Sequence, residues 1–290
     1  MTITASKFFA LDPGRLTPEV EDRFFTDLKT QNSTFKRTGR ARLNDVDACC
    51  VRNLAAAAAR IERVLDIGIS SGTSTLDLHD HLRAAGHAPR IIGTDLALDG
   101  YIVPALPGLR VLSDPGGHPM QYDLLGRAIR SWERRADYLT GMIAVRRMLA
   151  RFTRRAVQAR LEDGHGAQPV RLLSPRLKGH PAITVEVNDI FARTDRFVRR
   201  FDFVRAANIL NLGYFSEAEL RRALSNIFSY LSGGGAWLLV ARSKGSANAA
   251  TLFRLSPDGR RLLVMDRVGG GSEIERLVLS TPLPLHRVEA

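Results

Sequence analysis

The sequence predicts an α/β protein built on a Rossmann-like, doubly wound sheet. Short apolar runs alternate with amphipathic helices, the pattern of a mostly parallel sheet covered on both faces. The first such run passes through a turn of small residues directly into a helix, and two hairpin signals near the C-terminus predict antiparallel strands there. With 290 residues and 44% hydrophobic composition, the chain is long enough for a sizeable core and unlike a disordered one.

Residues 1–60 are predicted to form an N-terminal helical segment. Thr17 followed by Pro18 is a typical helix start, with the threonine as N-cap and the proline at the first helical position. A second helix is expected from Asn44. A basic stretch, Lys36–Arg42, separates the two starts.

Five short strands and two helices then define the Rossmann-like domain, expected at residues 61–112 and 181–290. The capping box of Ser216 and Glu219 opens the second helix, and Gly86 closes the first. The strands are expected at 64–67, 91–95, 183–187, 201–204 and 236–241, and the helices at 73–85 and 216–231. After residue 248, further strands are expected at 251–255, 261–265 and 273–279, joined by hairpin turns at 256–259 and 269–272.

The second and third strands are separated by far more residues than a plain crossover needs, so we expect a helical insertion at 113–180. It combines a turn-rich piece, 113–119, with a long helical stretch, about 123–161. Residues 121–180 hold 13 Lys+Arg and 5 Asp+Glu, which is +8 of the net charge of +12. Arg147, Arg151, Arg154 and Arg155 share one arc at helical spacing. Three roles stay open: a packed helix with a solvated basic face, a lid over a substrate pocket, or a docking surface for RNA, acidic lipid or an acidic protein.

The turn after the first strand is the main candidate for a ligand site. It reads Asp66-x-Gly68-x-Ser70-x-Gly72, and its small residues let a ligand approach free N–H groups at a helix N-terminus. Asp95 ends the second strand, where a carboxylate can accept hydrogen bonds from ribose hydroxyls. Asn188 and Asp189 end the third. All lie at the carboxyl ends of strands, where such sheets bind ligands.

This arrangement resembles the class I S-adenosylmethionine-dependent methyltransferases, in which an acidic-x-Gly-x-Gly-x-Gly loop follows the first strand and acids end the second and third. Ser70 replaces the middle glycine. The resemblance implies S-adenosylmethionine as cofactor and an unidentified methyl acceptor, a small molecule or a protein side chain. It places Asp66, Gly68 and Gly72 at the methionine and ribose end, Asp95 at the ribose, Asp189 with Ile190 at the adenine, and Ser70, Leu96, Asn188 and Asn208 in the same cofactor site.

Residues 201–215 are also similar to the fourth-strand motif of chemotaxis-receptor glutamate methyltransferases, with Asn208-Ile-Leu-Asn-Leu-Gly-Tyr-Phe before the next helix. That family's N-terminal helical domain and receptor-docking β-subdomain are not visible in the sequence, so the glutamate substrate is not carried over. Catalytic residues stay unknown. The candidates on the acceptor side are His118, Tyr122, Asn208, Asn211 and Tyr214.

Other functions compete with methyl transfer. Residues 68–72 also match Gly-x-Ser-x-Gly, the nucleophile elbow of α/β-hydrolases, but the loop follows the first strand and of the histidines only His286 follows the late strands. A nicotinamide-binding Rossmann domain would have glycine at Ser70. The alternative from another class is a catalytically silent methyltransferase-like module that docks an acidic partner through its basic insertion.

Composition limits the setting of the protein. The two cysteines, Cys49 and Cys50, are adjacent and no CxxC or Cys/His cluster exists, so we expect a reduced, cytoplasmic protein with no metal site. Neither a membrane-spanning run nor a secretory signal is expected. The positive charge permits nucleic acid or an acidic membrane surface as partner without favouring either.

Overall fold

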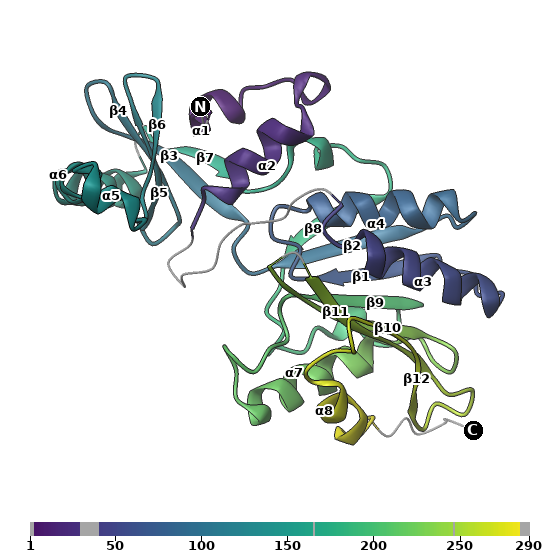
Figure 1. Ribbon diagram of the computed structural model, residues 1–290. Helices are drawn as coiled ribbons and strands as arrows, with labels where there is room; N and C mark the ends of the chain where they lie inside the picture. Colours follow the sequence, from purple (N-terminus) through teal and green to yellow (C-terminus); the bar gives the residue numbers. More distant parts are fainter. Residues whose placement is uncertain (1–2, 30–40, 165, 246, 285–290) are drawn as a thin grey trace. The chain divides into compact units, whose positions relative to one another are not determined.

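The computed structural model describes residues 3–29, 41–164, 166–245 and 247–284, which form two units with a sheet in each (Figure 1). The insertion unit comprises Met1–Arg40, Ser70–Thr73 and Ala97–Gly179. The parallel-sheet unit comprises Ala41–Ile69, Ser74–Leu96 and His180–Ala290. Of the basic stretch 36–42, residues 36–40 lie outside the described residues, as does His286.

The parallel-sheet unit has a seven-stranded sheet in the order β12-β11-β10-β9-β1-β2-β8. The five strands from β8 to β10 run parallel, and β11 and β12 add to β10 as an antiparallel meander. This confirms the mostly parallel sheet with antiparallel C-terminal strands. The strands are β1 (Arg63–Ile67), β2 (Arg90–Asp95), β8 (Ile183–Val187), β9 (Phe203–Ala207), β10 (Trp237–Lys244), β11 (Ala247–Leu255) and β12 (Leu262–Val268).

Side-chain alternation gives the two faces of this sheet different characters. Leu65 and Ile67 of β1 and Val204 of β9 belong to an apolar core with α7 (Glu217–Tyr230) and α8 (Glu275–Ser280). Asp66 and Arg205 point to the opposite face, which carries α3 (Asn44–Ala56) and α4 (Thr73–Ala84). Between β8 and β9 lies the short helix η3 (Asp195–Phe197).

The prediction of a strand at 273–279 is wrong, because most of this segment belongs to the helix α8. Ile274, Leu277 and Val278 are buried in the core at i, i+3 and i+4, the spacing of one helix face. The hairpin turn predicted at 256–259 is confirmed, since the Gly259 N–H donates to the Ser256 carbonyl and the Ser256 N–H to the Arg261 carbonyl. The C-terminal region therefore adds two antiparallel strands and a helix.

The insertion unit contains a five-stranded antiparallel sheet in the order β6-β5-β4-β3-β7. One face packs on the N-terminal helices, through a cluster of Phe8, Phe24 and Phe25 in which the rings of Phe8 and Phe24 stack at 3.8 Å. The other face packs on α6 through Leu149 and Val157. The elements are α1 (Ala5–Phe8), η1 (Pro13–Arg15), α2 (Pro18–Thr26), β3 (Asp99–Leu106), β4 (Leu109–Ser113), β5 (Pro119–Leu124), β6 (Arg127–Arg130), α5 (Ala136–Leu139), α6 (Met142–Asp163), β7 (Gln168–Arg171) and η2 (Pro175–Leu177).

The structure corrects the expected domain boundaries. The insertion begins near Ala97 instead of residue 113, contains a sheet as well as α6, and is completed by α1 and α2, whereas α3 belongs to the parallel-sheet unit. The expected helix from 123 is a hairpin over its first part. Leu125 (φ +49°) and Gly126 (φ +80°) form a two-residue turn between β5 and β6. The prediction failed here because the apolar residues on either side of the turn also have a spacing typical of a helix. The N-cap of Thr17 is confirmed, because its side chain accepts from the Val20 N–H.

No helix in the described part of the chain is long and apolar enough to span a membrane.

The capping box at the start of α7 gives a stability prediction. The Ser216 hydroxyl accepts from the Glu219 N–H while the Glu219 carboxylate accepts from the Ser216 N–H. Ser216→Ala is expected to lower the free energy of unfolding by about 1 kcal/mol in a urea titration. Ser225→Ala, on the exposed side of the same helix, is the matched control and should stay within about 0.5 kcal/mol of wild type. Equal effects of the two changes would contradict the capping role.

Candidate functional site

The carboxyl ends of the parallel strands form the candidate site. The strand order reverses between β1 and β9, with β2 and β8 on one side and β10 on the other. Sheets of this kind bind ligands in the crevice outside such a switch point. Gly68 follows β1, Asp95 ends β2, Asn188 follows β8 and Asn208 follows β9, so the fold brings these four predicted residues to one edge of the sheet.

The loop after β1 has the backbone of a glycine-rich turn although one glycine is missing. Gly68, Ser70 and Gly72 have φ of +76°, +57° and +78°. Ser70 thus adopts the left-handed conformation that glycine takes at no steric cost, at a cost of about 1–2 kcal/mol. The N–H groups of Gly68 and Ile69 both donate to the Thr94 carbonyl, at 2.7 and 3.1 Å, so β2 holds the start of the loop in place.

Gly68 also lies close to the segment after β9. A Cβ on Gly68 would approach the side chain of Ile209 to 3.1 Å. The lack of a side chain at this position therefore lets the loop after β1 pack against the loop after β9, directly at the switch point.

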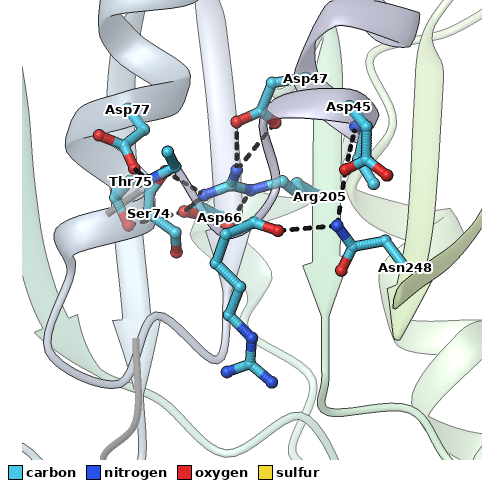
Figure 2. Close-up of polar contacts among 11 residues, drawn as sticks. Asp45, Asp47, Asp66, Ser74, Thr75, Asp77, Arg205 and Asn248 are labelled. Carbon is cyan, nitrogen blue, oxygen red and sulfur yellow. Dashed lines mark hydrogen bonds and ion pairs between the residues drawn. The ribbon is translucent and has the colours of Figure 1, made fainter. Parts of the chain in front are cut away.

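Asp66 is buried in an ion-pair network that the sequence analysis did not predict (Figure 2). Its Oδ1 and Oδ2 accept from the Arg205 guanidinium at 2.8 and 2.7 Å, and the Thr75 hydroxyl donates to Oδ2 at 2.7 Å. Arg205 donates in addition to Asp47 at 3.1 Å and to the Ser74 carbonyl at 2.8 Å. The carboxylate of Asp66 therefore faces the protein interior, joining β1, β9, α3 and α4.

Two carboxylates share one guanidinium in this network, and all three side chains are inaccessible to solvent. All three nitrogens of the Arg205 guanidinium donate: Nε and Nη2 to Asp66, Nη1 to Asp47, and Nη2 also to the Ser74 carbonyl. Desolvation raises the pKa of Asp47 to about 6, against the opposing attraction of Arg205. Burial opposes the charge on Arg205, but the two aspartates outweigh it and hold its pKa above the ordinary value.

Arg205 and Asp47 are the residues that sequence reasoning missed. The signal was present, because Arg205 interrupts the otherwise apolar strand Phe203–Ala207. A charge in the middle of a buried strand has to find an acidic partner. The register pairs Arg205 with Asp66 of β1, whereas Asp47 comes from a distant helix.

The residues that follow β2 and β8 differ in exposure. Asp95 is half-buried, and the neighbouring Leu96 is 65% exposed. Asn188 donates to the Thr194 hydroxyl at 2.7 Å, and the carboxylate of the exposed Asp189 accepts from the Phe191 N–H at 2.9 Å. Ile190 is buried in the core. Asp95, Leu96 and Asp189 thus offer surface to a ligand, while Ile190 supports the loop from beneath.

Asn208 links the end of β9 to the β10–β11 hairpin. It has φ +63°, and its side-chain oxygen accepts from the Ser243 N–H at 2.7 Å. The Ser243 hydroxyl donates to Asn248, whose amide donates in turn to the Arg42 carbonyl. The same amide donates to Asp45 (Figure 2). This chain of hydrogen bonds fixes the turn before α3 at the same edge of the sheet.

The remaining acceptor-side candidates are dispersed. Tyr214 is 65% exposed, whereas Asn211 is buried and accepts from the Gly213 N–H at 3.1 Å. His118 and Tyr122 belong to the insertion unit. The expectation for Tyr122 is wrong: its side chain is buried beneath α6, where desolvation raises its pKa to about 12, so it presents no hydroxyl to a substrate.

One cavity of the parallel-sheet unit lies at the opposite end of the sheet. It measures about 500 Å³, and Arg63, Arg90 and Phe201 in its lining belong to the amino ends of strands or the residues just before them. It is therefore separate from the carboxyl-end site. No group of three or more potential metal ligands occurs among the described residues. Cys49 and Cys50 are buried, and neither forms a disulfide.

Comparisons with known proteins give only distant matches. No protein-family model and no curated protein matches the chain. Superimposed solved structures include a citrinin polyketide synthase CMeT domain (16% identity, 62% of this chain and 28% of that chain, TM-score 0.31). The N-methyltransferase NodS from Bradyrhizobium japonicum WM9, in complex with S-adenosyl-L-homocysteine, matches at 14% identity over 70% of this chain and 62% of that chain, with a TM-score of 0.33.

The amino pentose methyltransferase CalS10 from Micromonospora echinaspora, solved with S-adenosylmethionine bound, matches at 17% identity over 77% of this chain and 70% of that chain, with a TM-score of 0.32. This chain thus spans less than two thirds of the first two structures. Superpositions this weak carry no inference about function, which has to come from the residues of this chain.

The buried network predicts a large stability cost for its central residue. Arg205→Met would leave two aspartates without their counter-charge, so we expect the free energy of unfolding to fall by about 3–5 kcal/mol. The control is Arg63→Met, because Arg63 forms a partly exposed pair with Asp202 and its loss should cost under about 1 kcal/mol. Urea unfolding of both variants measures the difference. Similar losses of unfolding free energy in the two variants would contradict the central role of Arg205 in the stability of the unit.

The raised pKa of Asp47 predicts a pH dependence. Because the folded-state pKa of about 6 exceeds the ordinary aspartate pKa of 3.8, the folded protein binds more protons than the unfolded chain between these values. The contribution of Asp47 to stability is therefore full below about pH 4 and is lost as the pH rises through about 6. Subtracting the unfolding free energies of Asp47→Asn from those of wild type across pH 4–8 should isolate this fall. A difference that grows with pH would contradict it.

Proposed function

We propose that this protein is an S-adenosylmethionine-dependent methyltransferase acting on an unidentified acceptor, a small molecule or a protein side chain. The observation that carries this function is the turn that follows β1, with φ positive at residues 68, 70 and 72. The Thr94 carbonyl, one residue before the acid that ends β2, accepts from the first two N–H groups of this turn. A small-residue turn between a strand and a helix, with a carboxylate at the end of the adjacent strand, suits a ligand that carries a ribose.

The residues present fit the cofactor at this edge. Gly68, Ser70 and Gly72 would let the methionine end approach the backbone, since two lack a side chain and the third has a small one. Asp95 would accept hydrogen bonds from the ribose hydroxyls. Exposed Leu96 would offer an apolar surface to the adenine, with Asn188 and Asp189 reading its edge. Ile190 and Asn208 support the two loops on either side.

Asp66 has a different role in this proposal from the one that the family resemblance implies. Its carboxylate already accepts three hydrogen bonds from Arg205 and Thr75. We assign it the positioning of the loop, because it fixes the end of β1 to β9 and to the first turn of α4. Backbone groups of the loop would then interact with the charged groups at the methionine end of the cofactor.

When bound, the cofactor supplies a methyl group activated by a positive sulfur. Such a methyl group would be open to direct displacement by an acceptor's lone pair, with the electrons of the broken carbon–sulfur bond returning to sulfur. The protein then has mainly to align the acceptor with the methyl group and exclude water. A protonated acceptor would additionally require a base. The acceptor-side candidates of the parallel-sheet unit are Asn208, the buried Asn211 and Tyr214, which is exposed beyond β9.

The resemblance of 201–215 to chemotaxis-receptor glutamate methyltransferases stays a prediction about this segment, and glutamate is not part of the proposed activity. The alternative function is a silent relative that binds the cofactor and acts through its basic insertion. Binding without methyl transfer to any acceptor, in a screen of cell extracts with a labelled methyl donor, would favour that alternative.

Calorimetric titration with S-adenosylmethionine and S-adenosylhomocysteine tests the cofactor site. Asp95→Ala is expected to weaken binding by about 1–3 kcal/mol, because hydrogen bonds from the ribose to a charged acceptor are lost. Asp80→Ala, a mostly exposed aspartate on α4, is the matched control and should bind as wild type does. Failure of the wild-type protein to bind either compound at high micromolar concentration would refute the function, and unchanged binding by Asp95→Ala would remove Asp95 from the site.

A further inference from the structure

The outward face of α6 carries unpaired positive charge. Arg151, Arg154 and Arg155 are exposed, and none of them takes part in an ion pair within the part of the chain that is described. Arg147, on the same arc, lies 3.5 Å from Glu133. Residues 121–180 hold 13 Lys+Arg against 5 Asp+Glu, so this face sits in a strongly basic region of the sequence.

The orientation of α6 is fixed by what lies beneath it. Leu149, Thr153 and Val157 are buried at helical spacing, and Leu149 and Val157 pack on the sheet of the insertion unit. Near its start, Arg146 donates to Asp137, which also accepts from Arg130 of β6 at 2.6 Å. Burial would raise the pKa of Asp137, but hydrogen bonds from the Arg134 N–H and from both arginines outweigh it and hold the pKa at about 2. The helix is thus anchored with its arginines turned outward.

Large apolar side chains accompany these arginines. Met148 and Phe152 are 51% and 63% exposed, and their i, i+4 spacing places them in one row beside Arg151 and Arg155. Leu139, just before the helix, is 92% exposed. The phosphate backbone of a nucleic acid offers no apolar environment for exposed Met and Leu side chains. The boundary between the headgroups and acyl chains of a bilayer can accommodate both the apolar side chains and the cations.

We propose that the outward face of α6 docks on an anionic lipid bilayer. Arg151, Arg154 and Arg155 neutralise lipid phosphates or carboxylates, and Phe152 and Met148 enter the headgroup and acyl boundary. The interaction is peripheral, because the apolar side of α6 already packs on the sheet of its own unit. It does not depend on the methyltransferase function, because every residue involved lies in the insertion unit.

Vesicle co-sedimentation of the full chain tests this surface. We expect binding to phosphatidylglycerol–phosphatidylcholine vesicles at low salt, little binding to pure phosphatidylcholine, and a decline as salt is raised. The triple variant R151Q/R154Q/R155Q should bind about 100-fold more weakly, at about fivefold for each arginine. Phe152→Ser should also weaken binding while leaving its salt dependence unchanged.

The matched control is R260Q/R261Q/R276Q, which removes the same charge from exposed positions of the parallel-sheet unit and should bind as wild type does. Circular dichroism confirms that each variant is folded. Equal weakening by both triple variants would overturn the assignment to α6, because it would reflect net charge alone. No vesicle binding by the wild type, or tight binding to duplex DNA or RNA in its place, would overturn the lipid surface.

Discussion

The fold of the parallel-sheet unit depends on how one buried arginine is neutralised. Arg205 occupies the middle of β9, where a charge without partners would cost more than the unit could recover from packing. Asp66 of β1, Asp47 of α3 and the Ser74 carbonyl at the start of α4 surround it. Any arrangement of these four elements that left the guanidinium without acceptors would be destabilised, so the polar network favours the observed packing.

The same network connects the interior of the unit to its ligand-binding edge. Asp66 is two residues before Gly68, and Ser74 is two residues after Gly72. Both ends of the loop are therefore tied to Arg205, while the Thr94 carbonyl holds its first two N–H groups. A loop fixed at its ends can keep a left-handed serine at residue 70 and stay preorganised for a ligand.

Local signals in the sequence predicted the elements that depend on local chemistry. The caps at Thr17 and Ser216 and the Asp258–Gly259 turn appear where expected, because each depends on neighbours in the chain. All five apolar runs contain strands, but the fourth was expected at 201–204 and β9 runs Phe203–Ala207, so Arg205 fell outside the predicted strand. The strands of the insertion unit were missed since their stability comes from pairing across the sheet and from Phe8 and Phe24, far away in the sequence. At the site, the positions of the loop and of Asp95 at the ends of their strands were predictable. The Asp66 carboxylate is occupied by Arg205, which lies 139 residues later in the chain and also donates to Asp47 of a distant helix.

The composition of the insertion unit bears on how the chain folds as it is synthesised. The sheet of this unit buries Ile102, Leu112 and Met120 against Phe8 and Phe24. The phenylalanines therefore leave the ribosome long before their partners exist, and the helices that carry them are too short to be stable alone. Until β3 to β5 are made, these aromatic side chains have no sheet to pack on, so the order of synthesis leaves them exposed to water in the nascent chain.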